Sequence, residues 1–107
     1  MEVRVTSRDI GPRTVVEVDV YTAPKLRERI AELLDGGIGA VIVDLGRVDF
    51  MDSTGLGVLV GTLKKVRLAG GQLQLVIDSE RLLKVFRITA LLQVFTVHET
   101  VEAALDA

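Results

Sequence analysis

The chain has 107 residues and a mass of 11.6 kDa, the size of one domain. Apolar residues make up 49% of it and charged residues 26%, proportions that are typical of a soluble globular protein. The absence of cysteine excludes disulfides, thiolate zinc sites and cysteine nucleophiles, and a formal net charge of −2 does not favour binding to a polyanion.

The pattern predicts an N-terminal hairpin. Val3 and Val5 alternate with polar residues, which is typical of a half-buried strand, and residues 14–20 are a second β-rich run. Gly11 and Pro12 break the chain between the two runs, as expected for an antiparallel pair.

A helix is predicted next, with Thr22 as its N-cap and Gly36 at its end. Its apolar residues recur at helical spacing, which predicts one stripe that faces the core. These residues are Leu26, Ile30, Leu33 and Leu34.

The remaining elements alternate between strand and helix. Residues 40–43 are continuously apolar, as in a strand that is covered on both faces. The other predicted elements are a helix at about residues 54–69, a strand at 73–77, a helix capped by Ser79, a short strand at 94–97 and a terminal helix at 99–107.

The predicted order is therefore ββαβαβαβα. Strands that are joined by single helices are expected to be parallel, through right-handed crossovers. This gives one α/β domain over residues 1–107, with a mixed sheet of five strands and four helices, in which the N-terminal strand is the antiparallel partner.

Binding sites of α/β domains lie at the carboxyl edge of the sheet. Two connections reach that edge, residues 19–24 and residues 44–55, and the second is long and rich in polar side chains. Asp52 or Ser53 would begin the following helix, where backbone N–H groups lack helical partners and negative charge is favoured. Either residue could be an N-cap without further function.

Gly57 and Gly61 lie four residues apart in the following helix. Each costs up to about 1 kcal/mol relative to alanine, so a close approach of some other group is expected there. Packing against the sheet and contact with a partner both explain such an approach, and the periodicity does not separate them.

Enzyme signatures are incomplete. The segment Asp52-Ser53-Thr54-Gly55 resembles the Asp-Thr/Ser-Gly of aspartic proteases, but it has an additional residue and lies in a helical context. Met51 stands where the Gly-x-Ser-x-Gly of serine hydrolases needs its first glycine. The single histidine, His98, is predicted to be exposed between a strand and a helix, and we expect no catalysis.

Metal and nucleic-acid sites are also disfavoured. Asp44, Asp49 and Asp52 could hold Mg²⁺, but no glycine-rich phosphate loop accompanies them, and ending a strand, shaping a turn and capping a helix explain them better. Basic residues on the helices are spaced like solvated faces. Three of the four aromatic residues, including Phe50, lie in apolar contexts, so no stacking platform is predicted.

The run from Val41 to Leu45, followed by the run from Val48 to Gly61, resembles the signature of STAS domains. More narrowly it resembles free-standing bacterial anti-sigma factor antagonists, and residues 19–26 and 86–89 match the actinobacterial members in particular. The similarity covers essentially the whole chain.

This resemblance implies a mechanism. The unphosphorylated protein would bind an anti-sigma factor that is also a serine kinase of the histidine-kinase-like ATPase fold, and so release a sigma factor for transcription. The kinase would end this binding by phosphorylating Ser53, or less plausibly Thr54, and a metal-dependent serine phosphatase would restore it.

Two positions depart from the family pattern. The Gly-Glu pair that usually precedes the aspartate matching Asp19 is absent, so that either the second strand is shorter or residues are missing from this sequence. Ala90 replaces the usual glycine after the third helix, and an alanine adopts a left-handed conformation less readily.

We therefore predict an anti-sigma factor antagonist that is cytoplasmic, with no cofactor, no metal, no bound nucleic acid and no membrane span. Two alternatives are a STAS binding subunit of a lipid-transport or signalling assembly and a nucleotide-binding domain. The predicted partner-binding residues are Asp19, Thr22, Asp52, Ser53, Thr54, Gly55, Leu56, Gly57 and Gly61.

Overall fold

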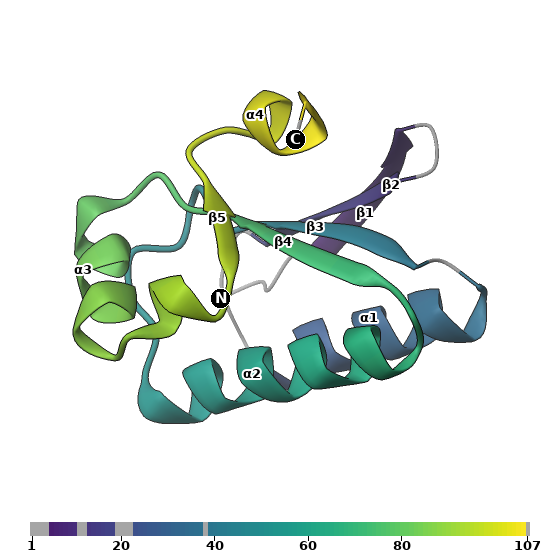
Figure 1. Cartoon of the computed structure of the whole chain (residues 1–107), viewed down its shortest axis with the longest axis horizontal. Helices are drawn as coiled ribbons and strands as arrows, with labels where there is room; N and C mark the ends of the chain where they lie inside the picture. The colour runs from purple at the N-terminus through teal and green to yellow at the C-terminus, as the bar shows by residue number, and fades with distance from the viewer. Residues whose placement is uncertain (1–4, 11–12, 19–22, 38, 107) are drawn as a thin grey trace.

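The structure, a computed structural model, describes residues 5–10, 13–18, 23–37 and 39–106 (Figure 1). Its centre is a five-stranded sheet in the order β1-β2-β3-β4-β5. β1 is antiparallel to β2, and the other neighbouring strands are parallel. The predicted mixed sheet, with its antiparallel N-terminal strand, is confirmed. The strands are Val5–Ile10, Arg13–Val18, Ala40–Asp44, Gln72–Val76 and Thr96–His98.

Helices cover both faces of the sheet. α1 and α2 pack against each other on one face, and the short α4 lies on the opposite face (Figure 1). The larger apolar cluster lies between the sheet and α1, α2 and α3, while a smaller cluster lies under α4. The helices are Ala23–Asp35, Ser53–Leu68, Glu80–Ile88 and Val101–Asp106.

The apolar periodicity explains how the helices are oriented. Leu26 and Ile30 of α1 are buried, and Leu33 and Leu34 pack against the same core, so the predicted stripe is confirmed. The centre of the sheet is equally apolar: the three middle residues of β3, residues 41–43, are all buried, as expected for a strand covered on both faces.

The C-terminal elements differ from the prediction. Residues 91–93 form a 3₁₀ turn, and Val94 and Phe95 donate their backbone N–H groups to Leu91 O instead of to a strand. Phe95 is drawn inward because its ring packs edge-on against that of Phe86, with centroids 6.0 Å apart. β5 therefore begins at Thr96, two residues later than predicted, and α4 is shorter than the predicted terminal helix.

Candidate functional site

The loop from residue 45 to residue 52 is held to the core at three points. Leu45, Val48 and Met51 are buried, while Arg47, Asp49 and Phe50 are exposed. Two backbone bonds fix its start: Leu45 N–H donates to Val76 O at 2.8 Å, and Val48 N–H donates to Leu45 O at 2.9 Å. The loop therefore carries its exposed side chains on an anchored backbone.

Phe50 is one of these exposed side chains, contrary to its predicted apolar setting. It is 64% exposed, between buried Met51 and exposed Asp49. Apolar residues recur at every third position of this loop, at 45, 48 and 51, and point inward, so position 50 points outward. This period of three was the signal available in the sequence. Exposed aromatic residues often anchor protein–protein contacts.

Asp52 is the N-cap of α2. Its Oδ1 accepts the Gly55 N–H at 2.8 Å, and its backbone oxygen accepts the Leu56 N–H at 3.0 Å. Ser53 is the first residue of the helix and is exposed, as is Thr54. The backbone N–H groups of these two residues have no acceptor within the helix, because none precedes them at the required distance. Of the two cap candidates, the structure selects Asp52.

Gly55 and Leu56 were also predicted to contact a partner. Both are buried, and Leu56, which is 8% exposed, belongs to the main core. They support the start of α2 from beneath because the helix turns this part of its surface toward the sheet. Asp19 and Thr22, which were assigned to the same surface, lie outside the described residues.

Gly57 and Gly61 do not pack against the sheet. Both are exposed, and a Cβ atom added at either glycine would meet no atom of the described residues within 4 Å. They lie instead on an open groove with a volume of about 340 Å³. The described residues that line the groove are Arg27 of α1 and Thr54, Gly57, Val58, Gly61, Thr62 and Lys65 of α2.

Two acidic residues of this region, Asp44 and Asp52, have structural roles. Asp44 ends β3, and its Oδ1 accepts the Gly46 N–H at 2.9 Å to shape the following turn, while Asp52 caps α2. No three of the described His, Asp and Glu side chains gather into a group that could hold a metal ion. The turn-and-cap interpretation of Asp44 and Asp52 is confirmed.

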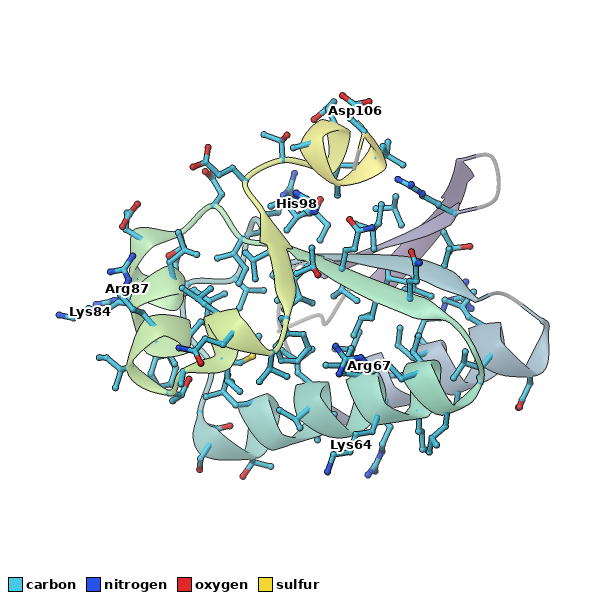
Figure 2. The ribbon with its side chains drawn as sticks, in the orientation of Figure 1. Lys64, Arg67, Lys84, Arg87, His98 and Asp106 are labelled. Atoms are coloured by element: carbon cyan, nitrogen blue, oxygen red, sulfur yellow. The ribbon has the colours of Figure 1, made fainter. Side chains whose placement is uncertain are left out.

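His98 lies within β5, paired with Val76, and is half-buried rather than exposed between two elements. Its carbonyl oxygen accepts the Ile77 N–H at 2.9 Å. Figure 2 places the side chain on the α4 side of the sheet. The histidine is therefore part of β5, the strand at one edge of the sheet.

Residues 1–104 match the STAS domain family. A Bacillus subtilis protein named anti-sigma-B factor antagonist is 46% identical over 91 residues, which cover 85% of this chain and 83% of that protein. The chain belongs to the STAS-domain family of anti-sigma factor antagonists. Proteins of this family are regulators rather than enzymes, in agreement with the prediction.

Two solved structures of this family have similar folds. An anti-sigma factor antagonist from Mycobacterium paratuberculosis has a TM-score of 0.86 and 25% identity, over 98% of this chain and 92% of that one. The phosphorylated form of the Bacillus cell fate determinant SpoIIAA has a TM-score of 0.70 and 22% identity, over 96% and 97%. The predicted α/β STAS fold is thereby confirmed.

None of the helices in the described part of the chain is both long enough and apolar enough to cross a lipid bilayer.

Proposed function

We propose that the unphosphorylated chain binds an anti-sigma factor through the start of α2, that this releases a sigma factor for transcription, and that phosphorylation of Ser53 ends the binding. The observation that carries the proposal is that Ser53 is exposed while Asp52 alone caps the helix. The serine hydroxyl is therefore available for modification without loss of the cap. The recorded phosphorylated form of SpoIIAA supports a switch of this kind.

The docking surface of this proposal follows the described edge of α2. It comprises Asp52, Ser53, Thr54, Gly57 and Gly61, which are all exposed. Asp19 and Thr22 complete it as predictions from the sequence. Gly55 and Leu56 belong to its buried support.

The partner in this proposal is a serine kinase that holds ATP. The Ser53 oxygen attacks the γ-phosphorus, ADP leaves, and the hydroxyl proton is released. A serine phosphatase reverses the modification by hydrolysing the phosphate ester. In this proposal the chain needs no cofactor and acts in the cytoplasm. Its residues 19–26 and 86–89 resemble those of actinobacterial antagonists.

Phosphorylation is expected to act on the complex rather than on the fold. It adds about −1.5 to −2 charges, and the beginning of a helix tolerates negative charge. In a docked complex the same group would be desolvated beside Asp52 and against the partner. A penalty of about 2.7 kcal/mol suffices to weaken binding 100-fold.

The test uses Ser53→Ala and Ser53→Asp baits in a lysate of the native host, with bound proteins identified by mass spectrometry and their affinities then measured with purified components. We expect an anti-sigma factor kinase on the Ala bait and at least tenfold weaker binding to the Asp bait. The melting temperature of Ser53→Asp should stay within about 4 °C of wild type, as for other surface substitutions.

A phosphorylation assay with the captured kinase and ATP separates the two hydroxyls. Wild type and Thr54→Ala should incorporate phosphate, and Ser53→Ala should not. Capture of the same transport or signalling subunits by both baits, with no kinase, would refute the proposal, and so would a large loss of melting temperature in Ser53→Asp.

A further inference from the structure

The groove beside α2 begins next to Ser53. Thr54, at one end of its lining, is the neighbour of that serine, and Lys65 lies at the other end of the same helix face. The eleven helical steps from Thr54 to Lys65 span about 16 Å at the rise of an α-helix, or three turns. The groove is thus continuous with the proposed docking surface and long enough to follow a helix.

The packing of the described residues does not require the glycines that line the groove. Alanine is a better helix former than glycine, and its Cβ atom at position 57 or 61 would lie more than 4 Å from every described neighbour considered. Neither glycine has the positive φ that would exclude a side chain. The two glycines therefore lower the stability of the helix and leave its backbone uncovered on this face. This indicates that a group from outside the described fold approaches the helix closely here.

The charge of the groove indicates which kind of partner surface would bind there. Arg27 and Lys65 are the charged side chains among its described lining residues; both are positive and exposed. Neither is engaged in an ion pair with a described carboxylate. The hydroxyl of Thr62 is already used, since it donates to Val58 O at 2.8 Å. A positive groove on a chain of net charge −2 is complementary to an acidic surface.

We propose that this groove receives a helix of the anti-sigma factor, and that carboxylates on this helix face Arg27 and Lys65. The inference rests on the proposed function and adds the chemistry of the partner's contact. Helix axes approach more closely where the residues at the crossing are small, so the two glycines admit the backbone of the partner helix. The same helix then lies alongside Ser53, so a phosphate there opposes an acidic neighbour.

The first test adds methyl groups to the groove by replacing its glycines with alanine. Gly57→Ala, Gly61→Ala and the double variant are compared with wild type for affinity to the anti-sigma factor captured by Ser53→Ala, and for melting temperature. We expect the double variant to melt at the same temperature or higher and to bind at least tenfold more weakly. Misfolding would not explain weaker binding by a variant that is at least as stable as wild type.

The second test reverses the charge. Arg27→Glu and Lys65→Glu should each weaken binding about tenfold, and a Glu→Lys change on the partner helix should restore part of the affinity to Lys65→Glu. Lys64→Glu is the matched control: Lys64 is exposed on the same helix, outside the groove lining, and points away from the sheet (Figure 2). Its affinity should stay within about twofold of wild type.

The outcomes separate the two proposals. If Ser53→Asp loses binding while the glycine variants bind like wild type, the groove inference is wrong and the switch stands. If no anti-sigma factor binds the wild-type chain, both fail. Tighter binding by Lys65→Glu would show that the partner surface is basic. If the wild-type chain were a dimer and the glycine variants were monomers, the groove would be the contact with a second copy of this chain. Either result overturns the inference.

Discussion

Asp52 and Ser53 are adjacent residues with separate tasks. The Asp52 carboxylate accepts the Gly55 N–H and closes the first turn of α2, whereas the Ser53 side chain lies outside the cap. Sequence preference does not distinguish them, since aspartate and serine are nearly equal as N-caps. The division of tasks matters for a switch, because a serine that capped the helix would lose that role when modified.

We expect Asp52→Ala to lower the free energy of unfolding by about 1 kcal/mol, the usual cost of losing an N-cap side chain. Urea denaturation measures this change. Asp49→Ala removes an exposed carboxylate from the same loop and should stay within about 0.5 kcal/mol of wild type. Equal losses in the two variants would contradict the cap assignment.

In the described part of the chain, three helices are followed by a residue in the left-handed region. Gly37 after α1 has φ +86° and Gly70 after α2 has φ +79°, and both are glycines, which adopt this conformation without strain. After α3 the same position is taken by Ala90, with φ +60°. The departure from the family pattern seen in the sequence therefore lies at a strained position, because the Cβ atom of alanine crowds the backbone there.

Ala90→Gly should raise the free energy of unfolding by about 1 kcal/mol, since relief of left-handed strain exceeds the added freedom of the unfolded chain. Thermal denaturation measures the difference. Ala69→Gly is the matched control, because Ala69 ends α2 at φ −82°, where glycine relieves nothing and should cost up to about 1 kcal/mol. Stabilisation by both changes would argue against strain as the cause.

At the scale of the whole molecule, residues of β2 and β3 hold the C-terminal helix α4 in place. Arg13 at the start of β2 donates to the carbonyl oxygens of Ala104 and Leu105 at 2.9 and 2.5 Å, across more than 90 residues of sequence. Ala104 also packs with Val15 and Ile42 in the smaller apolar cluster. A helix of six residues is too short to be stable by itself, so α4 depends on these contacts.

Arg13→Ala should therefore lower the free energy of unfolding by about 1–2 kcal/mol and increase amide hydrogen exchange in residues 101–106. Exchange measured by mass spectrometry reports on α4 separately from the sheet. Arg87→Ala, on the far α3 helix, should leave exchange in α4 unchanged (Figure 2). Unaltered protection of α4 in Arg13→Ala would show that apolar packing alone retains the helix.

Sequence reasoning was most accurate where the residues of a short segment are enough to specify its structure. The runs that became β3 and β4, the glycine after α1 and the Ser79 cap were all predicted to within about one residue, because burial periodicity and turn chemistry act over short distances. It was wrong for Phe50 and for the start of β5. Both depend on which apolar residue turns inward, and that is settled by partners remote in the chain, such as Phe86 for Phe95.

By itself, the sequence determined the order of elements and the mixed sheet, since both follow from local patterns and from the handedness of crossovers. The choice of Ser53 as candidate phosphoacceptor came from the resemblance of its motif to STAS domains. Only the tertiary structure decided that Asp52 is the cap, that Leu56 is buried, and that the glycine face of α2 opens beside Arg27 rather than onto the sheet. Periodicity shows that a helix has distinct faces, but the rotation of the helix, and hence the neighbour of each face, depends on how all the elements pack together.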